Sequence, residues 1–210
     1  MNRMISVGSG VGMLLLAGTA TAAYQGMSAE LHATSAHGNT YRIYVDLDAG
    51  ARLDAVYGSS ANPLVLGGNG LYHTPMWGVD MASTLNADLI AVFTSLAYDS
   101  WVTIGLDNMT GNVLSQQGVD FSGFGDEVTT DNGSWYITPD DAQGEEVGGR
   151  VLIAQLTLAG GEDDLYGNLS FQGKDADGNT WEALDQWLPA PGALALLGLA
   201  GIAGRRRRRA

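Results

Sequence analysis

The chain has 210 residues, of which 23 are acidic and ten basic, and its formal net charge is −13. It contains no cysteine, which excludes disulfide bonds, thiol catalysis and cysteine-ligated metal centres, but it is long enough to bury one hydrophobic core without them. Residues 24–187 contain all 23 acidic residues but only four basic ones, so this segment has a net charge of −19. Such a charge repels nucleic acid, because nucleic-acid binding requires lysines and arginines that neutralise phosphates.

The first 22 residues have the three parts of a secretory signal peptide. Arg3 gives a positive start, residues 5–17 are mostly apolar, and Ala20 and Ala22 form a small-x-small cleavage site. A retained membrane helix is the alternative, and the short, glycine-containing apolar run disfavours it. We expect signal peptidase to cleave near residue 22 and the remainder to be exported.

Residues 24–187 alternate strand-like segments with turns. Apolar and polar side chains alternate in residues 40–48, as in a half-buried strand, and residues 150–158 are apolar enough for a central strand. Four further strands are predicted at residues 100–106, 134–138, 165–172 and 180–184, with short helical turns at 83–88 or 111–117.

This pattern predicts an all-β fold with a single domain at residues 24–187. Turn signals recur throughout the segment and no long amphipathic helix interrupts it. We expect one antiparallel β-sandwich of jelly-roll or cohesin- or immunoglobulin-like topology, flanked by the signal peptide and a short C-terminal membrane helix.

Residues 175–179 form a predicted turn that is a weak candidate for a calcium site. Asp175, Asp177 and Asn179 place oxygen atoms at alternate positions before Thr180, and oxygen ligands suit calcium. The glycine and glutamate positions of a helix–loop–helix calcium site do not match, however. A tight Asp-Gly turn between two strands is the favoured interpretation.

Catalytic and metal-binding patterns are absent from the sequence. His32, His37 and His73 lack metal-ligand spacing, and no serine lies in a Gly-x-Ser-x-Gly motif. Twenty-three acidic residues make some carboxylate pair inevitable, so no pair can be nominated for glycoside hydrolysis. We therefore predict that the protein is not an enzyme.

The five tryptophans have two interpretations, a place in the core or a stacking surface for sugar rings. Trp101 and Trp135 each neighbour an apolar strand residue, which places them opposite the presumed core face, but an aromatic side chain on a strand more often belongs to the core. The others are Trp77, Trp181 and Trp187.

The last 23 residues combine three parts in an order typical of membrane sorting. Two prolines precede an uncharged run at 193–204, and five arginines follow it. The run measures about 18 Å as a helix against a hydrocarbon core of about 30 Å, so the helix must begin near residue 190 to span even a thin bilayer. Arginines stay on the cytoplasmic side and fix the orientation. The motif residues are Pro189, Ala190, Pro191, Arg205, Arg206, Arg207, Arg208 and Arg209.

This tail, residues 188–210, resembles the PEP-CTERM sorting signal of bacteria, in which Pro-Glu-Pro precedes an apolar helix and an arginine cluster. Ala190 replaces the usual glutamate, so the tail is similar to a Pro-Ala-Pro variant. The resemblance implies cleavage by exosortase, a membrane-embedded cysteine peptidase, after transient anchoring in the inner membrane with the arginines in the cytoplasm. Residues 98–105, 133–141 and 151–157 are similar to uncharacterised exported bacterial proteins with this kind of tail.

These observations predict an exported, non-catalytic protein of the cell surface or extracellular matrix. A polysaccharide- or calcium-binding sandwich is the first alternative, and a secreted hydrolase is the second. The expected partners are signal peptidase, an exosortase-type membrane peptidase, the membrane during transit and exopolysaccharide, but no nucleic acid. We expect no cofactor, with calcium as the open alternative.

Overall fold

The computed structural model describes residues 23–159 and 165–188. The predicted signal peptide lies outside this part, as does the sorting motif. Within the described ranges, no helix has both the length and the apolar character needed to cross a membrane. The predicted residues outside the described part are Ala20, Ala22, Pro189, Ala190, Pro191 and Arg205 to Arg209.

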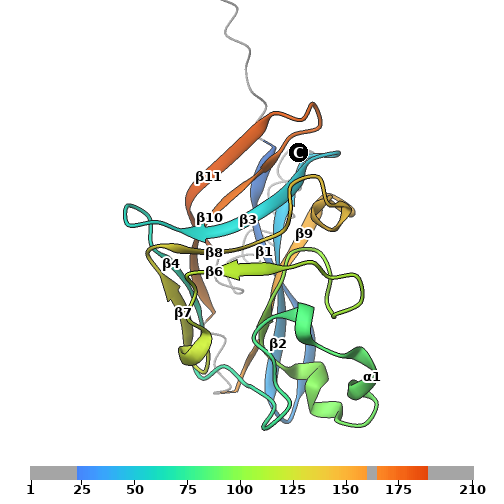
Figure 1. Ribbon diagram of the computed structural model, residues 1–210. Helices are drawn as coiled ribbons and strands as arrows, with labels where there is room; N and C mark the ends of the chain where they lie inside the picture. The colour runs from blue at the N-terminus through green and yellow to red at the C-terminus, as the bar shows by residue number, and fades with distance from the viewer. Residues whose placement is uncertain (1–22, 160–164, 189–210) are drawn as a thin grey trace, which may run out of the picture.

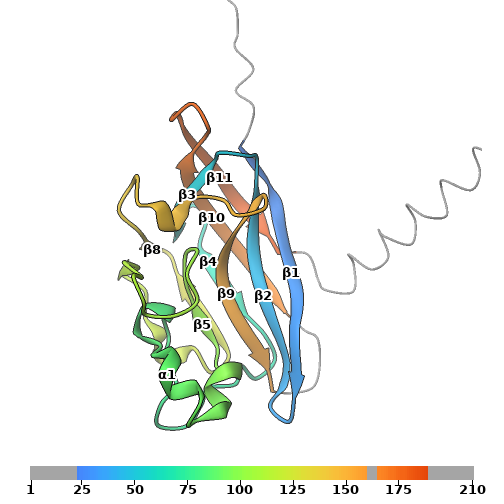
Figure 2. The ribbon, with the colours of Figure 1, turned by 90° about the vertical axis from the view of Figure 1, so that its right-hand side faces the viewer.

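The fold is all-β and consists of two antiparallel sheets that form two layers (Figures 1 and 2). The first sheet has the order β1 (Tyr24–Ser35), β2 (Gly38–Leu47), β9 (Arg150–Leu158) and β5 (Trp101–Val102). The second has the order β6 (Ser115–Gln117), β8 (Gly133–Tyr136), β3 (Arg52–Gly58), β10 (Tyr166–Lys174), β4 (Leu64–Gly67) and β7 (Glu127–Thr130), and β11 (Thr180–Trp187) pairs with β10.

Strand β10 organises the second sheet because three strands pair with it. Its C-terminal half pairs with β3, its N-terminal half pairs with β4, and β11 pairs along much of its length. A hydrogen-bonded turn that begins at Asp175 connects β10 to β11, which confirms the Asp-Gly turn predicted from the sequence. Five strands therefore lie side by side in the order β6, β8, β3, β10 and β11.

The core lies between the two sheets and follows the alternation of the strands. In β2, Ile43, Val45 and Leu47 point into it and are almost completely buried, while the residues between them are partly exposed. Burial of these side chains provides most of the driving force for packing the sheets together.

Strand β9 is buried on both faces, from Val151 to Leu158. Its outer face is covered by a short helical segment formed by η1 (Ala82–Thr84), α1 (Ala87–Ile90) and η2 (Thr94–Tyr98). Leu85 and Leu96 of this segment pack with Trp101 and Leu152 in a second apolar cluster. Two shorter turns complete the structure, η3 (Phe121–Gly123) and η4 (Ala142–Gly144).

Several predicted elements are confirmed. The predicted strand at residues 150–158 has the bounds of β9, and the helical turns at 83–88 correspond to η1 and α1. The alternative helical turn at 111–117 is wrong, since β6 occupies its end.

The two strand tryptophans divide between the sheet faces. Trp135 is fully buried in the core, as favoured for an aromatic side chain on a strand, and does not lie on the opposite face that its apolar neighbour indicated; its indole N–H donates to the carbonyl of Thr103 at 3.2 Å. Trp101 does lie on the outer face of its sheet, but the helical segment covers it.

Candidate functional site

An open groove of about 610 Å³ crosses the outer face of the second sheet, and we call it the outer groove. Its lining residues come from, or lie directly beside, five strands, β6, β8, β3, β10 and β11. Figure 1 shows these strands side by side. Four inter-strand spacings separate β6 from β11, or about 19 Å at the usual distance between strands. Its lining residues are Ala55, Tyr57, Gly58, Gln117, Gly118, Asn132, Gly133, Ser134, Gln172 and Glu182.

Cross-strand register brings the lining side chains together. Tyr57 on β3 lies opposite Ser134 on β8, which in turn lies opposite Gln117 on β6. Gln172 on β10 lies between Ala55 on one side and Glu182 on the other. Residues in register share one face of a sheet, so these side chains all point outward. The small side chain of Ala55 leaves the space between its larger neighbours open.

The polar side chains of the groove are free to bind a ligand. Six of them line it, with amide, hydroxyl and carboxylate groups that together both donate and accept. In the part of the chain that the structure describes, none of the six makes a hydrogen bond within the protein. They are Tyr57, Gln117, Asn132, Ser134, Gln172 and Glu182.

Tyr57 is the aromatic side chain of the groove. Desolvation by burial raises the pKa of its hydroxyl, and the charge of Glu182 adds to this effect. The hydroxyl therefore keeps its proton at neutral pH and can donate a hydrogen bond, while the ring offers an apolar surface. Together these groups can bind a polyhydroxylated chain.

Glycine shapes one end of the groove. Gly118 has a φ of +70°, and a Cβ atom there would overlap the carbonyl oxygen of Asn132. Gly133 likewise approaches the backbone of Gly118 too closely for a side chain. The hydroxyl of Thr130 donates to the Gly118 carbonyl at 3.0 Å, which fixes this corner. The backbone of Gly118 and Gly133 thus forms the floor at this end of the groove.

Two other hollows lie against the first sheet. One of about 440 Å³ is lined by Arg42 and Arg150, and a smaller one of about 220 Å³ also includes Arg42. Both arginines are already paired, Arg42 with Asp107 at 3.1 Å and Arg150 with Glu30 at 2.9 Å. The charges of both arginines are therefore neutralised by neighbouring carboxylates in these two hollows.

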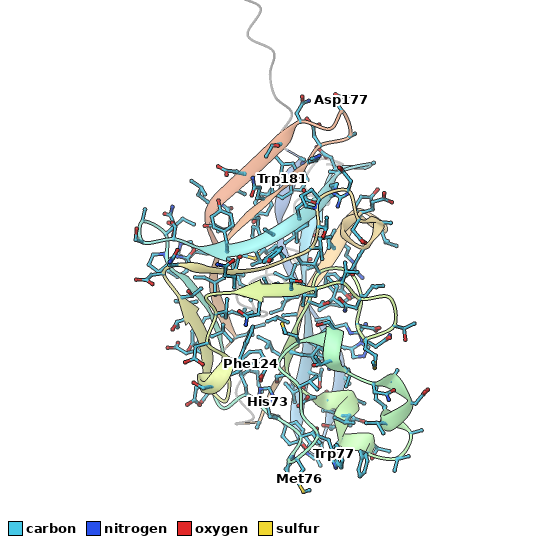
Figure 3. All side chains as sticks on the ribbon, in the orientation of Figure 1. His73, Met76, Trp77, Phe124, Asp177 and Trp181 are labelled. Carbon is cyan, nitrogen blue, oxygen red and sulfur yellow. The ribbon has the colours of Figure 1, made fainter. Side chains whose placement is uncertain are left out.

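A buried polar centre lies beneath the loop at residues 74–79. The carboxylate of Asp99 is fully buried and accepts hydrogen bonds from the backbone N–H groups of Thr74 at 2.8 Å and Val79 at 2.6 Å. His73 lies between Asp99, 3.4 Å from its Nδ1, and the carbonyl of Phe124, 3.1 Å from its Nε2 (Figure 3). Both ring nitrogens are engaged, so His73 links the loop to the sandwich.

The same loop carries two apolar side chains, Met76 and Trp77, that are exposed at the protein surface. Met76 is 91% exposed and adopts a φ of +68°, and Trp77 stacks on Phe93 with ring centroids 5.2 Å apart. Figure 3 places both at the opposite end of the molecule from Asp177. Among the five tryptophans, Trp187 is also exposed, whereas Trp181 is half-buried against Tyr24.

The residues nominated for calcium form a hairpin turn. Asp175 Oδ1 accepts from the backbone N–H groups of Asp177 at 3.0 Å and Asn179 at 2.8 Å, and Oδ2 accepts from the Asn179 amide at 3.0 Å. These bonds account for the Asx-type turn without a metal ion. In residues 23–159 and 165–188, no three acidic, histidine or cysteine side chains cluster as metal ligands.

The groove residues belong to no motif in the sequence, although a sequence signal for some of them exists. Tyr57 and Ala55 alternate with the buried Val56 on β3, and Gln172 follows Phe171 on β10. Alternation therefore marks each as outward-facing. It does not reveal that β6, β8 and β3 become neighbours, because those strands are far apart in sequence.

Comparison of the chain with protein-family models, curated proteins and solved structures gives no match.

Proposed function

We propose that this chain is an exported, non-catalytic protein of the cell surface or extracellular matrix that binds polysaccharide through the outer groove. The observation that carries the binding proposal is the set of six free polar side chains on five strands of one open groove. Such a groove suits an extended chain of hydroxyl-rich units, because every unit can meet a donor or an acceptor.

The route to the surface is proposed from the sequence. Signal peptidase removes residues 1–22, and the helix near 190–204 holds the protein in the inner membrane with its arginines in the cytoplasm. An exosortase-type peptidase then cuts near Pro189 to Pro191. The charge of −19 on residues 24–187 supports release into water, since it keeps copies of the domain apart.

A non-catalytic role is supported by what the polar groups do in the fold. His73 and Asp99 satisfy each other and the backbone, and Arg52 is paired with Asp54 at 2.7 Å. These groups stabilise the structure, and none of them lines the outer groove. A calcium-binding module and a secreted hydrolase remain the alternatives, with no specific observation in their favour.

For the topology we propose the cohesin- or immunoglobulin-like alternative rather than the jelly roll. The order β1-β2-β9-β5 corresponds to strands A, B, E and D of an immunoglobulin constant domain, and β3-β10-β11 corresponds to C, F and G. Strands β6 and β8 then extend the second sheet beside C. An experimental structure with another strand order would overturn this assignment.

Polysaccharide binding is tested by affinity electrophoresis of residues 23–188 in gels containing matrix polysaccharide. We expect retarded migration, and we expect Gln117→Ala and Gln172→Ala to reduce it. Gln25→Ala is the matched control. Gln25 lies on β1, outside the groove lining, and its side-chain amide donates a hydrogen bond of 2.9 Å to Asp48. Equal retardation of all three variants and the parent would overturn the groove as the binding site.

Sorting is tested in cells that contain an exosortase. Changing Arg205 to Arg209 to glutamine should leave the precursor in the inner membrane fraction, because the cytoplasmic charge is lost. A five-lysine variant retains that charge and serves as the control. Normal maturation of the glutamine variant, followed by immunoblotting, would refute the sorting proposal.

A further inference from the structure

We infer that the outer groove selects a polysaccharide that carries free amino groups, such as one with non-acetylated amino sugars, over neutral or uronic-acid chains. This inference rests on the proposed function and names the ligand class of the same groove. It follows from the position of the charges around the groove.

Among the described residues that line the groove, Glu182 is the one carboxylate, and none is a lysine or an arginine. Its side chain is exposed on β11, opposite Gln172, so it faces a ligand in the groove. At the other end, Asp131 is exposed in the turn directly before Asn132 and Gly133. Acidic side chains thus lie near both ends of a groove about 19 Å across.

The nearest cations on the same strands do not offset this charge. Lys174 of β10 is paired with Asp140 at 3.1 Å, and Arg52 of β3 is buried against Asp54 at 2.7 Å. Among the residues that the structure describes, an anionic chain therefore meets carboxylates without a free cation beside them, and like charges at an interface disfavour binding. A cationic chain meets the opposite sign.

The neutral centre of the groove suits the sugar rings between the amines. Tyr57 supplies an aromatic surface and a protonated hydroxyl, and Ser134 and Gln117 continue the polar row on β8 and β6. Hydrogen bonds and stacking are common to every glycan, so they give affinity without choosing its charge. The choice depends on the carboxylates at the ends of the groove, above all on Glu182, which lines it.

The test is isothermal titration of residues 23–188 with three hexasaccharides: glucosamine, N-acetylglucosamine and galacturonic acid. We expect the glucosamine hexamer to bind most tightly and the galacturonic acid hexamer to bind least. Glu182→Gln should weaken binding of the glucosamine hexamer about two- to fivefold, the range for one exposed ion pair. It should leave binding of the N-acetylated hexamer unchanged.

Asp177→Asn is the matched control, because it removes the same charge at the exposed tip of the β10–β11 hairpin, outside the groove lining (Figure 3). Equal weakening by both variants would show attraction to the acidic domain as a whole and overturn the inference. Preference for the acetylated or the acidic hexamer would also overturn it, while leaving the proposed function intact. Failure of all three hexamers and of matrix polysaccharide to bind would overturn both.

Discussion

The buried carboxylate of Asp99 lies 3.4 Å from Nδ1 of His73, at the base of the loop that carries Met76 and Trp77. Each of its oxygens also accepts a backbone N–H from this loop, from Thr74 and Val79. One carboxylate therefore fixes both the entry and the exit of the loop. Met76 lies between these two anchored ends and adopts a φ of +68°, a conformation that persists only where the surrounding structure holds it.

Replacing Asp99 by asparagine should destabilise the fold strongly. The amide keeps one acceptor oxygen but turns an NH₂ group toward a backbone donor, and it removes the charge that faces His73. We expect the free energy of unfolding to fall by about 3 kcal/mol, measured by urea denaturation. Asp88→Asn, on the exposed surface of α1, should cost less than about 0.5 kcal/mol. Similar losses in the two variants would contradict the proposed restraint.

His73 should make stability depend on pH near neutrality. Burial opposes its protonation, but the hydrogen bond to Asp99 and the Asp99 charge, with the Phe124 carbonyl and Asp80, raise its pKa overall above the usual 6.5. A raised pKa gives stability that is complete below about pH 6.5 and is lost as pH rises through the folded-state value.

Urea denaturation of the parent and His73→Gln at pH 6 to 8.5 measures this effect. The free energy of unfolding should fall with rising pH in the parent and fall less in the variant. Burial, followed by the charge of Arg42, lowers the pKa of His32. His32 therefore makes the free energy of unfolding rise with pH, and it does so in the parent and in the variant alike. Parallel curves for the two proteins would rule out the His73 contribution.

Gly118 and Gly111 form a matched pair for testing the corner of the groove. Their φ angles are +70° and +71°, but a Cβ atom on Gly118 would overlap the Asn132 carbonyl, whereas one on Gly111 meets open space. Gly111→Ala should cost about 1 kcal/mol for its backbone conformation. Gly118→Ala should cost about 1–3 kcal/mol more and should also weaken glycan binding. Equal thermal denaturation midpoints would refute the close approach.

The hairpin turn at Asp175 should stabilise the fold without calcium. Asn179, as the largest cause, and the turn backbone lower the pKa of the Asp175 carboxyl through hydrogen bonds. We expect Asp175→Ala to lower the thermal midpoint slightly. Asp177→Ala should not, since Asp177 contributes its backbone N–H to the turn. Added calcium should leave the midpoint unchanged; a calcium-dependent rise that Asp175→Ala abolishes would restore the metal interpretation.

The local sequence pattern is sufficient to predict those strands whose residues follow one clear periodicity. Residues 150–158 were recognisable as a strand because they are uniformly apolar, and β9 is buried on both faces. Strand β1 was missed, since much of it is exposed and it contains Gly26 at a register shift. The two interpretations of Trp135 have a similar origin: on the four-residue strand β8 the face cannot be assigned from sequence without the partner strand, β3.

The sequence by itself determined the class of fold, the acidity of residues 24–187 and the prediction of export, because composition and local order carry that information. Only the tertiary structure decided which polar side chains meet in the outer groove. The groove joins Tyr57, Gln117, Gln172 and Glu182 from separate parts of the chain, and it exists because long-range strand pairing places β6, β8, β3, β10 and β11 side by side. Pairing between distant strands depends on how the whole core packs, which no local pattern records.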